Sequence, residues 1–358
     1  MTKVKKIKDY LNRFFIDGLS GMALGLFCTL IIGTIIQQIA NLVGGPFGDT
    51  LHTIGSVAAS LTGAGIGCGV AYKFQVKPLV LLSAASSGMV GAFASRIIAG
   101  TFLLETGGIQ LIGPGEPLGA FLAAYIGIEL GNLVASRTKL DIVVTPLVSI
   151  LSGSFFGLLV GPPISAFMTG LGNIIEFGTQ QQPFLMGIIV SVAMGMILTL
   201  PISSAAVALS LGLTGLSGGA ATVGCCANMI GFAVASYREN KVSGLFAQGI
   251  GTSMLQVPNI YKKPAIWLPA IISSAVLGPL STIVFKMTNN PTGSGMGTSG
   301  LVGQIMTYQD MSATHDPVIL LAKIGLLHFV LPAVIALLVS EFMRKKSWIN
   351  PGDMKLDL

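Results

Sequence analysis

Charge is what this sequence has least of. Only 9% of its 358 residues are Asp, Glu, Lys or Arg, while 52% are hydrophobic. A soluble domain carries about a quarter charged residues, so this chain cannot hydrate the surface of a soluble globule. The shortage excludes an ordinary soluble domain. Together with long apolar runs, it predicts an all-α polytopic membrane protein embedded in the lipid bilayer.

Cysteine and catalytic motifs are also scarce. The four cysteines are Cys28, Cys68, Cys225 and Cys226, with no CxxC and no histidine at zinc spacing. We interpret them as small buried hydrophobic residues, and a redox-active vicinal pair at Cys225 and Cys226 is the less favoured alternative. The chain has no HExxH, no serine nucleophile elbow and no paired aspartates. We therefore predict no catalytic residue, no metal and no cofactor.

Basic residues gather at the two ends of the chain, which has a net charge of +6. The positive-inside rule then predicts that both termini are cytoplasmic and that the number of complete spans is even. This charge is a topology signal and does not indicate nucleic-acid binding. It fits a multi-pass protein of the bacterial cytoplasmic membrane. The residues concerned are Lys3, Lys5, Lys6, Lys8 and Arg13 at one end, and Arg344, Lys345 and Lys346 at the other.

The apolar runs and weak internal similarity predict the domain organisation. We expect about ten transmembrane helices plus re-entrant hairpins. Three short motifs recur in the same order in both halves, for example SLTGAGIGC and GLTGLSGGAATVGC. The predicted segments are an amphipathic surface helix over residues 1–17, a first membrane repeat over 18–200, a second over 201–346, and a cytoplasmic tail over 347–358.

Three apolar segments are too short or too rich in glycine to be simple spans. They cover residues 202–216, 245–257 and 291–306. Interrupted helices occur at membrane depth only where protein or a watery cavity covers their open backbone. Paired with internal repeats, they are the best sequence-level indication of a carrier's binding site. We therefore predict a carrier for a small polar solute.

Ionisable side chains within apolar runs are costly, so each is a functional candidate. Glu116 lies in GPGEP, a turn fixed by two prolines and two glycines, where its carboxylate could accept hydrogen bonds from a sugar. A simple loop is the equally weighted alternative. We interpret Lys323 as snorkelling and His328 as a packing residue. The full set is Arg96, Glu116, Glu129, Glu176, Lys323 and His328.

Uncharged polar side chains are densest between residues 228 and 259. On a helix, Gln248, Thr252, Gln256 and Asn259 would share one face, which suits a neutral hydrogen-bonding cavity. Hydrogen bonding between helices is the alternative. The predicted solute-binding residues are Glu116, Asn228, Gln248, Thr252, Ser253, Gln256 and Asn259, with Ser203, Ser204, Thr298 and Ser299 at two other helix breaks.

Longer motifs in the second half resemble a known family. LTLPISSAAVAL, GCCANMIGFAVASYRENKVSG, AQGIGTSMLQVPNI and GMGTSGLVGQ are similar to membrane (IIC) subunits of the phosphoenolpyruvate-dependent sugar phosphotransferase system. The resemblance covers nearly the whole chain. It is closest to the stand-alone branch that includes perfringolysin-regulator-like proteins.

This resemblance implies an elevator-type carrier, a homodimer whose moving domain holds a sugar. In coupled systems a IIB protein phosphorylates the sugar as it arrives. The sequence departs from that pattern because it contains no soluble IIA or IIB domain, so coupling would require a separate IIB partner. A membrane-embedded sensor or regulator, with a ligand pocket but no transport cycle, is the alternative function.

Overall fold

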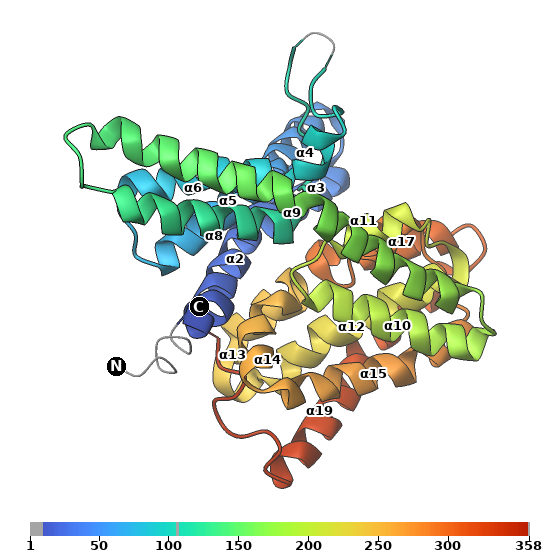
Figure 1. Ribbon diagram of the computed structural model, residues 1–358. Helices are drawn as coiled ribbons and strands as arrows, with labels where there is room; N and C mark the ends of the chain where they lie inside the picture. The colour runs from blue at the N-terminus through green and yellow to red at the C-terminus, as the bar shows by residue number, and fades with distance from the viewer. Residues whose placement is uncertain (1–9, 105–106, 357–358) are drawn as a thin grey trace. The chain divides into compact units, whose positions relative to one another are not determined.

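Helices make up almost all of the computed structural model, which describes residues 10–104 and 107–356 (Figure 1). These residues include no β-strand, only two isolated bridges. Six of the described helices are long and apolar enough to span a membrane, or seven if the bent pair Gly45–Ser60 and Thr62–Lys73 is one span. The chain is thus an all-α polytopic membrane protein, as its composition predicts, while the number of about ten spans stays a prediction.

Packing divides the chain into two compact units, Met1–Phe167 and Met168–Leu358. Helix α9 (Asp141–Thr179) contains the boundary between them. The predicted repeat boundary after residue 200 concerns sequence duplication, which this division does not test. The two repeats therefore stay a prediction.

The first span of the first unit is helical without interruption from Tyr10 to Asn41. The described end of the predicted surface helix over residues 1–17 therefore continues directly into this span. Residues 1–9, which contain most of its lysines, lie outside the described part of the chain.

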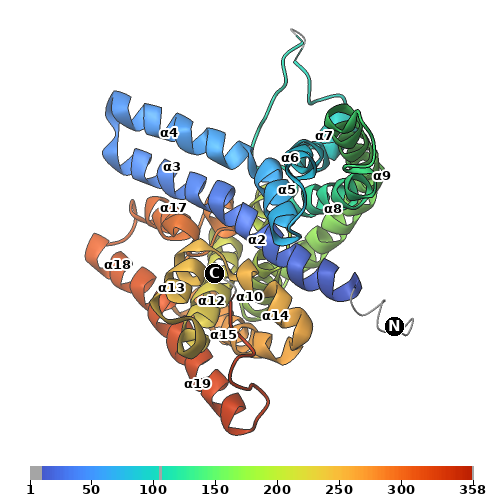
Figure 2. The ribbon, with the colours of Figure 1, turned by 90° about the vertical axis from the view of Figure 1, so that its left-hand side faces the viewer.

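Glycines allow the helices of the first unit to approach closely. Helix α2 packs on α5, α5 on α6, and α6 on α8 (Figure 2). A Cβ added at Gly25 in α2 would lie 2.2 Å from the carbonyl oxygen of Gly65 in α5, so only glycine fits. The main elements are α2 (Leu19–Leu26), α3 (Ile32–Val43), α4 (Gly45–Ser60), α5 (Thr62–Lys73), α6 (Pro78–Ala92) and α8 (Pro117–Val134).

Helix α12 (Gly215–Ala235) is the centre of the second unit and is almost completely buried. It packs against α10, α15 and α19, and Figure 1 shows it between α10 and α15. The contact with α10 is so close that a Cβ at Gly224 would lie 1.9 Å from the carbonyl oxygen of Ser191. The surrounding helices are α10 (Pro183–Thr199), α13 (Tyr237–Phe246), α14 (Val257–Lys262), α15 (Leu268–Pro279), α18 (Pro317–Gly325) and α19 (Leu331–Lys345).

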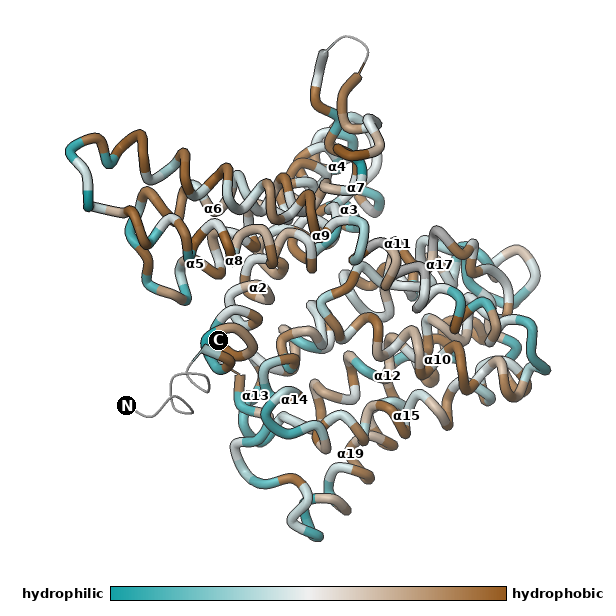
Figure 3. The backbone as a smooth tube through the Cα atoms, in the orientation of Figure 1, coloured by the Kyte–Doolittle hydropathy of each residue, from teal (hydrophilic) through white to brown (hydrophobic). Residues whose placement is uncertain are grey.

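Along the whole chain, hydrophobic residues follow the longer helices, whereas hydrophilic residues concentrate at turns and ends (Figure 3).

Short, interrupted helices occupy the three segments that the sequence predicts to be discontinuous. The broken elements are α11 (Ser204–Ser210), the π-helix η3 (Ala247–Gly251), the 3-10 helix η4 (Ser253–Gln256), α16 (Pro291–Ser294), the 3-10 helix η7 (Ser299–Leu301) and α17 (Val302–Met311).

The interpretation of all four cysteines as buried is wrong for Cys28. Cys225 and Cys226 are buried and Cys68 is half-buried, but Cys28 is exposed. It lies in the π-helical turn η2 (Phe27–Ile31), on a face of the first span that the rest of its unit does not cover. All four are free thiols.

Candidate functional site

The three broken segments of the second unit meet around helix α12. The hydroxyl of Ser204 in α11 donates to the carbonyl oxygen of Gly295, at 2.6 Å, just after α16. The hydroxyl of Thr298 donates to the carbonyl oxygen of Gly249 in η3. Gly297 packs directly on the backbone of Cys225 in α12. Tertiary structure therefore brings together segments that lie about 50 to 90 residues apart in the sequence.

Left-handed backbone marks the loop before α17. Gly297 and Gly300 have φ of 54° and 53°, and Leu301 has φ of 60°. Positive φ is uncommon for a side chain such as leucine. Such strain persists only where the surrounding structure enforces it, and it clusters at functional sites. The loop is therefore a candidate part of the site.

Asn228 of α12 forms a fully bonded centre beside this junction. Its side-chain oxygen accepts from Thr199 Oγ1 at 3.2 Å and from Trp267 Nε1 at 2.9 Å. Its amide nitrogen donates to Ser274 Oγ at 3.1 Å and to the carbonyl of Gly224. Thr199 also shares a hydrogen bond of 2.8 Å with Ser253. Asn228 and Ser253 are thus brought together, with protein groups as their partners.

The predicted polar stripe does not lie on one helix. Thr252 is extended, with φ of −160° and ψ of 141°, and separates η3 from η4. Its hydroxyl accepts from the backbone N–H of Met254, which caps the new helical turn. The expectation of one continuous helical face is therefore wrong, because a capping threonine ends the first turn and starts another.

Three amides of the stripe nevertheless form a continuous chain. Gln256 Nε2 donates to Gln248 Oε1 at 2.8 Å, and Asn259 Nδ2 donates to Gln256 Oε1 at 2.9 Å. Gln248 also donates to the hydroxyl of Ser236. All three amide side chains are buried. Their bonds favour the packing alternative, while a role in solute binding stays a prediction.

The amide chain ends on the C-terminal tail. Gln256 donates to the carbonyl oxygen of Met354 at 3.0 Å, and Asn259 donates to that of Lys355 at 2.8 Å. Asn240 binds the same stretch twice, donating to Met354 and accepting from the N–H of Leu356. The predicted cytoplasmic tail is therefore packed against its own unit up to Leu356.

A second polar group beside α12 is only partly bonded. Gln304 Nε2 lies 3.3 Å from Cys226 Sγ and 3.2 Å from His328 Nδ1. Gln304 Oε1 and His328 Nε2 are buried and have no hydrogen-bond partner among the described residues. The same is true of the hydroxyl of Ser299, in the left-handed loop five residues before Gln304. We call Ser299, Gln304 and His328 the unsatisfied cluster, in which Gln304 bonds to His328 and Ser299 precedes Gln304 in the chain.

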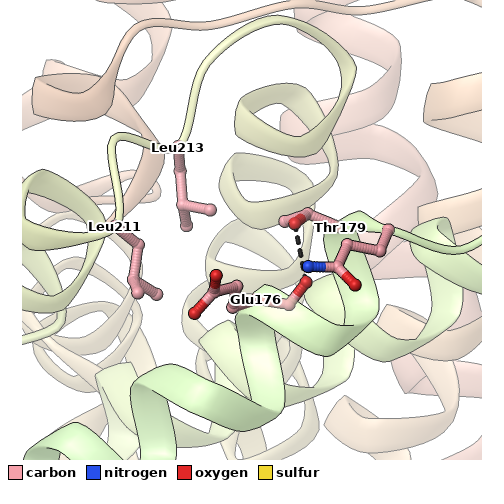
Figure 4. Close-up of a pocket in the computed structure, with 5 residues that line it drawn as sticks. Glu176, Thr179, Leu211 and Leu213 are labelled. Atoms are coloured by element: carbon pink, nitrogen blue, oxygen red, sulfur yellow. Dashed lines mark hydrogen bonds between the residues drawn. The ribbon is translucent and has the colours of Figure 1, made fainter.

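A cavity of about 330 Å³ opens elsewhere in the second unit (Figure 4). Its polar lining comes from Glu176, Thr179 and Gln180 at the end of α9, and Leu211 and Leu213 close its other side. The exposed carboxylate of Glu176 can accept hydrogen bonds from a ligand. This volume suits a small molecule.

The pocket adjoins the broken segments through the backbone of Leu213. The carbonyl oxygen of Leu213 accepts a hydrogen bond from Ser294 Oγ of α16 at 3.0 Å. Ser203, which is half-buried, precedes α11 in the same region. The pocket and the junction are therefore parts of one folded unit.

Glu116 belongs to the first unit, unlike the other ten predicted site residues. It caps α8, and its backbone N–H donates to the carbonyl oxygen of Ala92 at 2.7 Å. Burial of the carboxyl raises the pKa of Glu116 from 4.5 to about 7, while a hydrogen bond from the N–H of Leu118 partly opposes this rise. Gly115, with φ of 72°, is required because a Cβ would lie 2.7 Å from that Ala92 oxygen. The turn therefore packs closely on the end of α6.

Several other ionisable residues have structural partners. Glu129 pairs with Arg13 at 2.9 Å, and the ammonium group of Lys323 donates to the carbonyl of Phe285. Glu239 and Arg344 form an ion pair of 2.9 Å with side chains only 8% and 9% exposed. Glu239 is therefore held by the tail and by α19, through the N–H of Gly352 and the guanidinium of Arg344.

Gln304 is the residue that sequence reasoning missed. It lies within the glycine-rich segment 291–306, which the sequence predicts to be a broken helix. A polar side chain in such a segment is a signal that could have identified Gln304. The sequence predicts that His328 is a packing residue. Its actual neighbour, Gln304, comes from a different element, and only the fold brings them together.

Residues 16–356 of this chain match the model of the family described as "Phosphotransferase system, EIIC". No curated protein matches it.

Proposed function

Because this chain belongs to the EIIC family of the phosphotransferase system, we propose that its second unit carries a neutral sugar or similar small polar solute across the bacterial cytoplasmic membrane. Family membership makes it a sugar-specific membrane permease component.

The convergence of three broken segments on α12 carries this proposal. Each helix break leaves backbone N–H and C=O groups without partners within their own helix. At membrane depth such groups need cover from protein or from a polar cavity. Carriers use helix breaks of this kind to bind solute near the middle of the bilayer. At the junction, the hydroxyls of Ser204 and Thr298 bond to the backbone carbonyls of Gly295 and Gly249, which supports this location.

The pocket beside Leu213 supports the same location. Its carboxylate, hydroxyl and amide groups can bind sugar hydroxyls, and its leucines can contact the apolar face of a sugar ring. We propose that solute passes through this pocket, with Glu176 accepting a hydrogen bond.

We propose an elevator mechanism in which the second unit moves with its solute. The three discontinuous segments named above lie in this unit, which suits a substrate-carrying part. The first unit would then be the scaffold that forms the homodimer, as the resemblance to IIC subunits implies. Phosphorylation of the sugar would require a separate IIB protein in the cytoplasm.

Uptake by the purified protein in proteoliposomes tests the function. Radiolabelled hexoses, disaccharides and hexitols are offered with and without a phosphorylated IIB protein. We expect saturable uptake of at least one sugar above that of empty liposomes. Binding of a sugar without uptake in either condition would instead support a sensor. Absence of both binding and uptake would contradict the proposed function.

A further inference from the structure

We propose that the unsatisfied cluster of Ser299, Gln304 and His328 is a binding site for the hydroxyl groups of a neutral, polyhydroxylated ligand. This inference rests on the proposed function and assigns the residues that hold the solute. It also adds Gln304 and His328 to the residues that the sequence predicts.

The cluster lies where the strained loop meets α12. Gly303 packs so closely on this loop that a Cβ there would lie 2.2 Å from the carbonyl oxygen of Gly297. Ser299 precedes Gly303 in the 3-10 helix η7, and Gln304 directly follows Gly303 in α17. Gln304 joins the loop to Cys226 of α12 and to His328 of the π-helix η8 (Leu326–Val330). Three elements thus hold the cluster in place.

The unpaired donors and acceptors of the cluster indicate which groups a ligand would need. Both N–H groups of Gln304 are used, one toward Cys226 Sγ and one toward His328 Nδ1. With Nδ1 accepting, the hydrogen of the neutral ring lies on Nε2. The cluster therefore leaves one donor on His328, one acceptor on Gln304 and the hydroxyl of Ser299, all without partners among the described residues.

A hydroxyl group is the simplest complement to this set because it donates and accepts at the same time. Neither Ser299 nor Gln304 carries a charge, and the neighbouring Cys226 is a thiol. A charged ligand would be left buried without a counter-charge from these residues, which is unfavourable. The site therefore favours neutral sugars or polyols over sugar phosphates and organic acids.

The unsatisfied cluster differs from Asn228 in how its polar groups are bonded. Asn228, which lies in the same helix α12 as Cys226, has partners for both its amide nitrogen and its oxygen. Buried polar groups are almost always bonded in this way, because an unpaired one is destabilising. Three unpaired groups next to a strained loop are the pattern expected where stability is lost in favour of binding.

Ser299→Ala and Ser273→Ala make a matched test. Both serines are buried, and both hydroxyls lack partners among the described residues, but Ser273 lies in α15, outside the cluster. Purified wild type is first screened by thermal shift against neutral hexoses, disaccharides and hexitols. The sugar with the largest shift is then titrated into both variants by calorimetry.

We expect Ser299→Ala to weaken sugar binding roughly threefold to a hundredfold with an equal or higher melting temperature. Ser273→Ala should have a similar melting temperature and bind as wild type. His328→Asn, which places an amide near the position of Nδ1 and removes Nε2, should weaken binding by a similar factor.

Equal sugar binding by Ser299→Ala, His328→Asn and wild type would overturn the proposal, since the cluster would then be satisfied by buried water. Tighter binding of a sugar phosphate than of its neutral sugar would also overturn it. A wild type that binds no sugar at all would contradict both this inference and the proposed function. Normal sugar binding by the wild type and by both variants would contradict this inference alone, so the two failures are distinguishable.

Discussion

Two buried polar regions of the second unit have opposite properties. The amides of Gln248, Gln256 and Asn259 bond to one another and to the C-terminal tail. Gln304 and His328 bond on one side only. Both regions are equally hidden from solvent, so burial does not distinguish them. The difference shows that a polar side chain's partners, rather than its polarity or depth, separate a structural network from a candidate binding site.

Deletion of the tail is the strongest way to break this comparison. Removing residues 347–358 takes the carbonyl partners from Gln256 and Asn259 and the buried side chains of Ile349 and Met354 from the core. We expect a loss of at least about 3 kcal/mol in stability, measured by thermal unfolding in detergent. Lys355→Ala is the control, because its side chain is exposed and its carbonyl remains. An unchanged melting temperature after deletion would show that the amide chain does not need the tail.

Gln256→Ala acts on the centre of the chain and should have the next largest effect. It leaves Gln248 Oε1 and Asn259 Nδ2 each without one partner. We expect a loss of about 2–3 kcal/mol in stability with unchanged sugar affinity per folded molecule. Gln309→Ala, at an exposed position of α17, should change neither. Lost affinity at normal stability would instead restore the stripe as a binding surface.

Glu116→Gln sharpens the comparison between bonded and unpaired polar groups, because the Glu116 carboxyl is largely buried and accepts a hydrogen bond from the N–H of Leu118. Since burial raises the pKa of Glu116 to about 7, the folded state holds the proton more tightly than the unfolded state does. Wild-type stability should therefore fall as pH rises from about 4.5 through 7. We expect the variant to be more stable by about 1–2 kcal/mol at pH 8, after allowing for partial hydration, and equal near pH 4.5. Parallel melting curves across this range would contradict the raised pKa.

The smallest effect is expected at Glu176. Its side chain is exposed, so Glu176→Gln should leave the melting temperature unchanged. Loss of one hydrogen bond to a sugar should cost about 0.5–1.5 kcal/mol of binding free energy, seen by calorimetry. Leu211→Trp, which would fill the cavity, should weaken binding further. Normal binding by both variants would remove the pocket from the solute path.

Composition and apolar patterning were enough to establish an all-α membrane protein, since lipid admits few other ways to satisfy a backbone. The same patterns located the helix breaks at residues 202–216, 245–257 and 291–306, because glycine and proline act locally. The turn at Glu116 was likewise readable from its neighbouring prolines and glycines. All of these features depend on residues close together in the sequence.

Tertiary structure alone decided which polar groups have partners. Gln256 meets Met354 across 98 residues, and Gln304 meets His328 across 24. A helical spacing rule cannot find such pairs, and it misplaced the stripe because Thr252 breaks the helix. Hydrogen bonds are short and directional, so a buried amide is structural or available for a ligand according to atoms that distant parts of the chain bring within about 3 Å.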